Sequence, residues 1–318
     1  METRKLYYED PFQKGFATTV VSCDAVKGGY AVVLAETAFY PEGGGQPYDT
    51  GVLGEANVLE VHEKDGVITH LCDKPFEVGK SVSGKIDWAR RFDHMQQHSG
   101  EHICSGLICE RFHCDNVGFH MGADVVTIDF NADISWDELM EIEQLANLYI
   151  YEDHPIDIQF YRGAELDKVE YRSKKPLEGD VRIVSFPGAD CCACCGTHVV
   201  RSGQVGLVKF LSVQKFRDGV RIELLSGKRA HRYLSECWAQ DVRIAQALSV
   251  KSNASFAGVE RVLAELSALK QRCAKLEESV FAQTAAQYEG KGDVLLFEDE
   301  MSGDSLRKLC DAVTNHCG

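Results

Sequence analysis

Three histidines recur at four-residue intervals within a segment that has the apolar period of a helix. His94, His98 and His102 occupy positions i, i+4 and i+8, and side chains four residues apart lie on one face of a helix. Two imidazoles at this spacing are close enough to bind one tetrahedral metal ion. The alternative is a set of solvent-facing histidines, which the common register and the small residues between them disfavour.

A cysteine-rich segment supplies further metal-binding groups. Cys191-Cys-Ala-Cys-Cys-Gly-Thr-His198 places the thiol of Cys194 four residues before an imidazole. The segment also contains two overlapping C-x-x-C pairs, so a redox pair or an iron–sulfur site stays open. A redox pair is expected in a βαβ setting, which the flanking sequence does not have. Adjacent cysteines cannot all face one metal ion, and ligation by Cys195 is a further alternative.

The first histidines also fit a different enzyme class. His98-Ser-Gly-Glu-His102 matches the H-x-x-E-H pattern of inverted zinc metallopeptidases, in which Glu101 would be the general base. That interpretation needs an acidic third ligand and leaves Cys194 and His198 without a role. We therefore treat a metallopeptidase as the weaker interpretation.

A glycine-rich segment near the N-terminus can bring bare backbone close to a ligand. Thr37-Ala-Phe-Tyr-Pro-Glu-Gly-Gly-Gly-Gln-Pro47 has neither the Lys-Ser/Thr of a P-loop nor the spacing of G-x-G-x-x-G. The glycines Gly43, Gly44 and Gly45 predict a tight turn that allows close approach. Taken alone, the segment is better explained as an ordinary hairpin turn.

The elements that must position these residues divide the chain into four parts. In residues 1–88, short alternating apolar runs predict a small β-barrel or sandwich. Residues 89–230 begin with a helix from Trp88 to about Phe112 and continue with strands and a helix that Ser135 could cap, which predicts a two-layer α+β domain with an antiparallel sheet. The strand candidates in this part are Val125–Phe130, Ile156–Tyr161, Val181–Phe186, Gly206–Val213 and Val220–Leu225.

The last two parts are helical. Residues 231–290 contain an a/d heptad seam, which predicts either a helical hairpin or a coiled-coil arm, and the arm is slightly favoured. Such an arm could pair two copies as a homodimer. The seam residues are Val259, Val262, Leu266, Leu269, Cys273, Leu276 and Val280. Residues 291–318 predict one strand, Val294–Phe297, and one helix, which is too little for a complete domain.

Composition limits the class of protein. A chain of 318 residues with 44% apolar and 26% charged residues is typical of a soluble globular protein of about two domains. It contains no apolar run that predicts a membrane span and no secretory signal. Its thirteen cysteines therefore indicate reduced thiols or metal ligands in the cytoplasm. A net charge of −15 disfavours a general nucleic-acid coat and an anionic membrane surface.

One stretch departs from this acidic balance. Residues 201–232 contain only two acids, Asp218 and Glu223, and this basic tract could contact an RNA. Its cations are Arg201, Lys209, Lys215, Arg217, Arg221, Lys228, Arg229 and Arg232.

Together, the glycine-rich segment, His-x-x-x-His and Cys-x-Gly-Thr-His resemble the editing domain of alanyl-tRNA synthetases and the free-standing AlaX proteins. The order and the distances of the three motifs fit, and the resemblance covers residues 1–230. Residues 231–318 resemble the helical linker and the start of the C-terminal domain of long AlaX proteins. Because the aminoacylation domain is missing, we expect a free-standing trans-editing protein.

This resemblance implies a zinc ion bound by His98, His102, Cys194 and His198. It implies hydrolysis of the ester that joins serine, and as a second substrate glycine, to tRNA(Ala). Four protein ligands are usual for a structural zinc, whereas catalysis needs an open or expanded position. The zinc would therefore either activate the water or hold the amino or hydroxyl group of the seryl moiety.

The resemblance also suggests which residues bind the substrate. Thr37 and Gln46 match positions used in substrate recognition, so we expect Thr37 to contact the seryl hydroxyl and Gln46 to place the ester. A site built to bond that hydroxyl can reject the alanyl ester by about 10⁴–10⁵-fold. We assign the backbone of the three glycines to the substrate, and Arg217 and Arg221 to the tRNA. A non-catalytic zinc- or tRNA-binding module is the alternative.

Overall fold

The computed structural model describes residues 2–173, 179–297, 299 and 301–317. The chain divides into two compact units, residues 1–234 and 235–318. The predicted α+β class with antiparallel sheets is confirmed. In the described part, no helix combines the length and the apolar character needed to cross a membrane.

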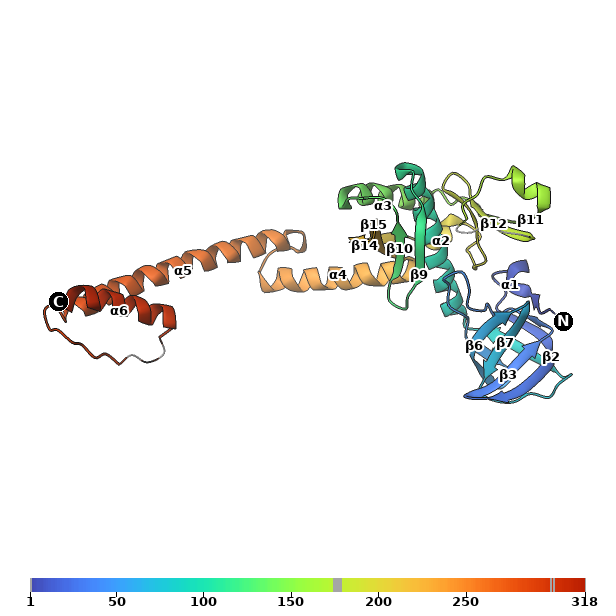
Figure 1. The fold of residues 1–318 in the computed structure, drawn as a ribbon, viewed down its shortest axis with the longest axis horizontal. Helices are drawn as coiled ribbons and strands as arrows, with labels where there is room; N and C mark the ends of the chain where they lie inside the picture. Colours follow the sequence, from blue (N-terminus) through green and yellow to red (C-terminus); the bar gives the residue numbers. More distant parts are fainter. Residues whose placement is uncertain (1, 174–178, 298, 300, 318) are drawn as a thin grey trace. The chain divides into compact units, whose positions relative to one another are not determined.

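Six antiparallel strands at the start of the first unit close into a barrel, in the order β2-β3-β7-β6-β5-β8 (Figure 1). Alternate residues face inward, so that apolar side chains such as Val32, Leu53 and Ile68 are fully buried. The strands are β2 (Gly15–Val26), β3 (Gly29–Leu34), β5 (Gly51–Leu53), β6 (Ala56–Lys64), β7 (Val67–Cys72) and β8 (Ser81–Ile86). Beside them lie β1 (Arg4–Lys5), α1 (Leu6–Glu9) and β4 (Glu36–Thr37).

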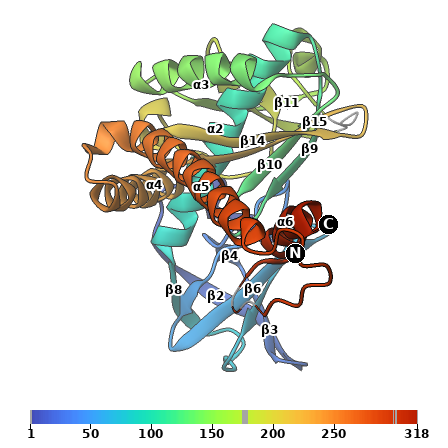
Figure 2. The same ribbon diagram turned by 90° about the vertical axis from the view of Figure 1, so that its left-hand side faces the viewer.

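The rest of the first unit contains two sheets and two long helices. Helices α2 (Trp88–Phe112) and α3 (Trp136–Tyr151) share one apolar core with the sheet β14-β15-β10-β9 (Figure 2). The predicted cap of α3 is confirmed as a capping box between Ser135 and Glu138. The strands of this sheet are β9 (Asn116–Met121), β10 (Val126–Phe130), β14 (Val208–Phe216) and β15 (Gly219–Ser226), and the second sheet consists of β11 (Asp157–Arg162), β12 (Asp180–Phe186) and β13 (Asp190–Ala193).

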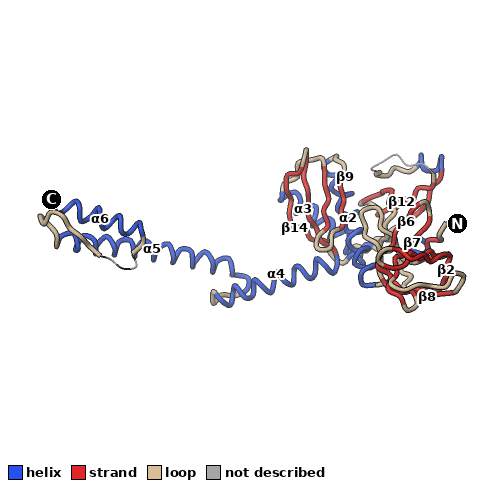
Figure 3. The backbone as a smooth tube through the Cα atoms, turned by 60° about the horizontal axis from the view of Figure 1, so that its bottom comes forward, coloured by secondary structure: helices blue, strands red, loops and turns tan. Residues whose placement is uncertain are grey.

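The second unit consists of helices and loops in its described part (Figure 3). Helix α4 (Gly227–Ala247) begins in the first unit and continues into the second, followed by α5 (Ser255–Ala286) and α6 (Gly303–Cys317). The predicted strand Val294–Phe297 is wrong: these residues have no regular structure. A single strand has no partner for its backbone groups, which explains why it does not form.

The heptad seam lies on α5, and its side chains remain about half exposed, with values of 46% for Leu266, 56% for Leu269 and 57% for Leu276. The C-terminal end of α5 is covered, because Phe281 and Ala285 pack against α6. A coiled-coil homodimer through this seam stays a prediction, which sedimentation of the chain at several concentrations would test.

Candidate metal centre

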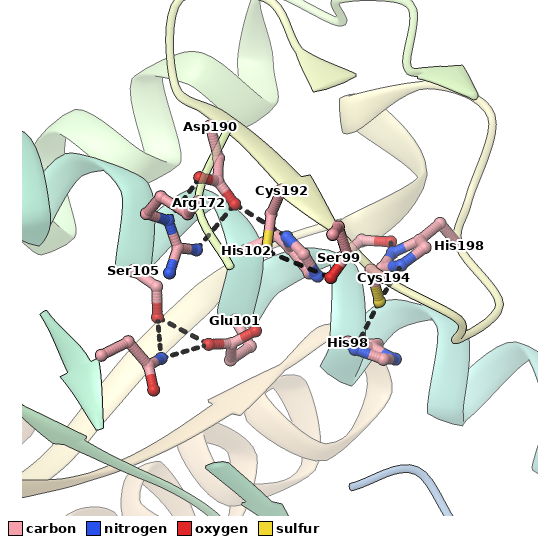
Figure 4. Close-up of polar contacts among 12 residues, drawn as sticks. His98, Ser99, Glu101, His102, Ser105, Arg172, Asp190, Cys192, Cys194 and His198 are labelled. Atoms are coloured by element: carbon pink, nitrogen blue, oxygen red, sulfur yellow. Dashed lines mark hydrogen bonds and ion pairs between the residues drawn. The ribbon is translucent and has the colours of Figure 1, made fainter. Parts of the chain in front are cut away.

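Four side chains from two segments converge on one point in the first unit (Figure 4). His98 and His102 come from α2, and Cys194 and His198 come from the loop after β13, and the nearest ligand atoms all lie within 4.8 Å of one another. The sulfur of Cys194 is 3.4 Å from Nε2 of His98 and 3.3 Å from Nε2 of His198. The three imidazoles are buried. The structure therefore brings together the four residues that the resemblance implied.

A glutamine from the barrel side of the molecule orients the first of these imidazoles. Oε1 of Gln46 lies 2.9 Å from Nδ1 of His98 and also accepts from the backbone N–H of Thr197 at 3.0 Å. Because this oxygen can only accept, Nδ1 of His98 carries the proton. The lone pair of Nε2 is then directed at the cluster, as metal ligation requires.

An aspartate performs the same task for the second imidazole. Oδ2 of Asp190 lies 2.8 Å from Nδ1 of His102, and the guanidinium of Arg172 donates to both carboxylate oxygens at 2.7 and 2.8 Å. Burial would raise the pKa of Asp190, but the hydrogen bonds from His102 and Arg172 lower it. Nδ1 of the third imidazole, His198, lies 3.2 Å from the hydroxyl of Ser99.

The sulfur in the cluster is held as a thiolate. Burial opposes ionisation of Cys194, but the imidazoles of His98, His198 and His102 bring its pKa well below the usual value. Burial lowers the pKa of His198, so that this imidazole is neutral. A thiolate and imidazole nitrogens are the ligands that zinc prefers, and four such groups suit a tetrahedral ion. The residues present therefore fit a zinc ion.

The glycine-rich turn lies against this cluster. It is closed by backbone hydrogen bonds in both directions between Gly43 and Gln46, at 3.1 and 2.9 Å. Gly44 has a φ of +59°, and a Cβ on it would lie 2.7 Å from the sulfur of Cys195. A side chain at this position would be strained by the backbone conformation and would collide with Cys195. Binding of a substrate to this backbone stays a prediction.

A buried ion pair fixes both ends of the loop that carries the turn. The carboxylate of Asp49 accepts from the backbone N–H of Tyr40 at 2.7 Å, and the backbone N–H of Asp49 donates to the carbonyl of Tyr40 at 2.9 Å. Nε of Arg91, on α2, lies 2.9 Å from the same carboxylate. Both charged side chains are fully buried, so they connect the loop rigidly to the helix that carries the histidines.

The two residues predicted to contact the substrate, Thr37 and Gln46, both lie in buried hydrogen-bond networks. Thr37 is fully buried in the barrel region, where its hydroxyl accepts from the N–H of Phe39 at 3.1 Å and lies 2.9 Å from Nε2 of His70. These two interactions leave one of the three hydrogen-bonding positions of this hydroxyl for a further contact. Gln46 is also fully buried, and its amide is taken up by His98 and Thr197. Gln46 therefore positions His98, whereas contact of Gln46 with the ester and of Thr37 with the seryl hydroxyl stays a prediction.

The general base of the metallopeptidase interpretation is also committed elsewhere. Oε1 of Glu101 accepts from the hydroxyl of Ser105 at 2.6 Å and from the amide of Asn116 at 2.8 Å. Figure 4 shows Glu101 turned away from Cys194. The H-x-x-E-H spacing therefore arises from a helix that presents its histidines to one site and Glu101 to a separate hydrogen-bond network.

The neighbouring cysteines lie outside the four-residue cluster. The sulfur of Cys195 is 3.8 Å from the hydroxyl of Tyr40, and Cys195 does not belong to either group of potential metal ligands in the described part of the chain. Cys192 forms a second group with His102 and Asp190, but burial raises its pKa to about 11, so that it is a neutral thiol. All thirteen cysteines are free of disulfide bonds.

At least half of the cations in the basic tract form ion pairs with acids from other parts of the chain. Arg221, for example, forms an ion pair with Asp129 at 2.7 Å and also lies over the ring of Phe216. Further pairs are Arg201 with Asp153, Lys209 with Glu143 and Arg229 with Asp93. The excess of positive charge that the sequence indicates is therefore smaller in the folded chain, whereas Arg217 is exposed at the tip of the β14–β15 hairpin.

Comparison with known proteins agrees with this geometry. Residues 12–90 match the family described as tRNA synthetases class II (A), and residues 181–223 match the threonyl and alanyl tRNA synthetase second additional domain. An alanine–tRNA ligase of Pyrococcus abyssi is 35% identical over 98% of this chain, but the chain spans only 36% of that ligase.

Shorter relatives are covered more completely. The alanyl-tRNA editing protein AlaX-L of Pyrococcus horikoshii is 30% identical over 94% of this chain and 75% of its own length. The alanyl-tRNA editing protein Aarsd1-A of Xenopus laevis is 29% identical over 89% of this chain and 73% of its own length. With the two family matches and the convergence of the three motifs, these relatives show that the chain belongs to the alanyl-tRNA editing protein family.

Proposed function

We propose that the chain is a trans-editing hydrolase that deacylates mischarged tRNA(Ala), chiefly the seryl and secondarily the glycyl ester, with zinc bound by His98, His102, Cys194 and His198. The observation that carries the proposal is the cluster of one thiolate and three imidazoles beside a bare glycine turn. The names of the relatives, which are alanyl-tRNA editing proteins, indicate the substrate class.

In this reaction, water adds to the ester carbonyl, the bond to the ribose oxygen breaks, and the free amino acid and the tRNA leave. An aminoacyl ester is already reactive, so positioning and stabilisation of charge matter more than a strong base. A zinc ion bound here would supply positive charge that lowers the pKa of a water or holds the amino or hydroxyl group of the substrate.

The residues of the chain then have distinct tasks. Gln46 and Asp190 fix the orientation of two imidazoles, and loss of such a partner typically costs about 10–100-fold in metal affinity or activity. We keep the backbone of the glycine turn as a proposed substrate contact, because the turn ends at Gln46, whose side chain bonds to His98. We keep Arg217 as a proposed tRNA contact. Arg221 would attract the tRNA less strongly, because its charge is partly neutralised by the ion pair with Asp129.

The test is metal analysis combined with deacylation of seryl-, glycyl- and alanyl-tRNA(Ala) by the purified chain. We expect about one zinc per chain and hydrolysis of the seryl and glycyl esters in preference to the alanyl ester. Cys194→Ala and His102→Ala should lose zinc and activity together, whereas Cys191→Ala, a matched change outside the cluster, should keep both. Activity in a zinc-free variant would overturn the proposed role of the metal.

Two other function classes give different results in the same assays. A non-catalytic zinc- or tRNA-binding module would keep its metal but release no amino acid. A metallopeptidase would cleave peptides and depend on Glu101, whereas we expect Glu101→Gln to leave deacylation largely intact, because that carboxylate bonds to Ser105 and Asn116.

A further inference from the structure

A pocket of about 430 Å³, separate from the metal centre, lies where helices α2 and α4 begin. Arg90, Asp93 and His94 line it from α2, and the side chains that α4 contributes are Lys228, Arg229 and Arg232. The lining thus contains four cations and one carboxylate, in a chain whose net charge is −15. This local reversal of sign indicates an anionic ligand.

Some of the charged groups in this pocket are not paired with other groups in the described residues of the protein. Arg229 forms an ion pair with Asp93 at 2.6 Å and donates to the carbonyl of Gly122 at 2.7 Å, so these two charges balance each other. Nε of Arg90 donates to the carbonyl of Tyr48 at 3.0 Å. Lys228 is exposed, and within the described part of the chain its ammonium has no acceptor. Arg90 and Lys228 can therefore meet a ligand.

Two further features of the pocket favour an anion. Helix α4 begins at Gly227, beside the pocket, so that the positive end of its dipole adds to the side-chain charge. His94 is only 3% exposed, and its Nδ1 has no hydrogen-bond partner in the described part of the chain. Burial, and then the positive charges of Arg90 and Arg229, lower the pKa of His94 to about 3. The ring is therefore neutral, and the pocket has a positive potential.

The pocket adjoins the candidate metal centre. His94 precedes His98 by four residues on α2, which corresponds to about 6 Å along the helix axis. Pro47, which also lines the pocket, directly follows Gln46, the residue that holds the imidazole of His98. An anion in the pocket would thus lie a short distance from a group bound at the cluster. The 3′ end of a charged tRNA has this arrangement, because phosphodiesters precede the terminal ribose that carries the ester.

We propose that this pocket binds a phosphodiester of the unpaired 3′ end of the tRNA substrate, with Lys228 and Arg90 as its charged contacts. The inference rests on the proposed function, since it assumes that the ester to be cleaved lies at the metal centre. It goes beyond that function because it states where a phosphodiester of the RNA strand binds. One of the residues that bind it, Arg90, is far from the basic tract in sequence.

The test is binding of uncharged tRNA(Ala) at a series of salt concentrations. Lys228→Ala should weaken binding and lower the slope of log affinity against log salt by about 0.7, the value for one phosphate contact on a single strand. Lys27→Ala removes the same charge from an exposed hairpin of the barrel and should leave the slope unchanged. An unchanged slope with Lys228→Ala would overturn the inference.

A second experiment locates the phosphate. A neutral methylphosphonate replaces each phosphodiester of the 3′ end in turn. At the contacted position it should weaken binding to the wild-type chain but cause no further loss with Lys228→Ala, because both changes remove one interaction. Additive losses at every position would refute the contact.

These results can be told apart from failure of the proposed function. Both experiments measure binding of uncharged RNA, so they remain informative for a chain that does not deacylate. If Lys228→Ala reduced binding of inorganic phosphate but left the tRNA slope unchanged, the pocket would be a site for free phosphate and the inference would be wrong.

Discussion

Replacement of Asp49 by asparagine tests whether the buried ion pair beside the glycine turn holds the loop and the helix together. The change keeps the size of the side chain and an oxygen that can accept from the N–H of Tyr40, but it removes the charge opposite Arg91. Asp49 and Arg91 are both fully buried, so the guanidinium would remain without a counter-ion and with little access to water.

The size of the effect follows from these contacts. Removal of one partner from a buried ion pair typically costs about 3–5 kcal/mol of unfolding free energy. Arg91 would keep two backbone acceptors, the carbonyls of Pro11 at 3.0 Å and of Ala38 at 2.6 Å. Because these dipoles still stabilise the guanidinium, we expect the lower end of the range, about 3 kcal/mol.

Urea unfolding measured by tryptophan fluorescence would test this prediction, since Trp88 lies at the start of α2. For a unit of this size, a loss of about 3 kcal/mol lowers the urea midpoint by about 1 M. Glu9→Gln is the control, because it removes an exposed ion pair of similar geometry, in which Arg4 donates to both carboxylate oxygens at 2.7 and 2.8 Å. If Asp49→Asn shifted the midpoint no more than Glu9→Gln, the argument from burial would be refuted.

Two further predictions concern the metal and pH. Asp190→Asn should weaken zinc affinity by about 10–100-fold in competition with a chelator, whereas Asp180→Asn, which breaks an exposed ion pair with Arg162, should not; equal losses would contradict the assignment. Burial lowers the pKa of His70 from 6.5 to about 4, so between these values the unfolded chain binds a proton that the folded chain does not. The unfolding free energy should therefore fall by about 3 kcal/mol as the pH falls from 6.5 to 4, and His70→Gln should remove that part of the fall; an unchanged pH dependence would show that His70 does not titrate in this way.

The parts of the site that local geometry fixes could be predicted from the sequence. The apolar period from Trp88 to Phe112 predicts a helix with the bounds that the structure has. Given that helix, the four-residue spacing alone places His98 and His102 on one face. Cys194 and His198 are likewise close in sequence, so only the meeting of the two segments depends on the tertiary fold.

The residues that orient the ligands could not be predicted in the same way. Gln46 is 52 positions from His98, and Asp190 is 88 positions from His102, so no local pattern connects them. The sequence held one signal, which is that Asp190 directly precedes the cysteine-rich segment. A search for carboxylates that could bond to the second nitrogen of each histidine could have used it. Thr37 shows a different limit of the sequence. Its motif indicates substrate recognition, whereas the structure shows that its buried hydroxyl contacts His70 in the barrel region.

The charge of the basic tract shows why a sum over a sequence window misleads. Arg201, Lys209 and Arg221 are neutralised by acids that lie 48, 66 and 92 positions away. A count over residues 201–232 cannot include these partners. In the pocket beside α4, by contrast, a distant part of the chain adds positive charge, because Arg90 lines the pocket together with residues of the tract.

The position of Gln46 couples the glycine turn to the metal ligands. Its amide bonds to His98 on α2 and to Thr197 in the loop after β13, while its backbone closes the turn with Gly43. Three segments therefore meet at one side chain. A metal ion that binds only this arrangement stabilises it by mass action.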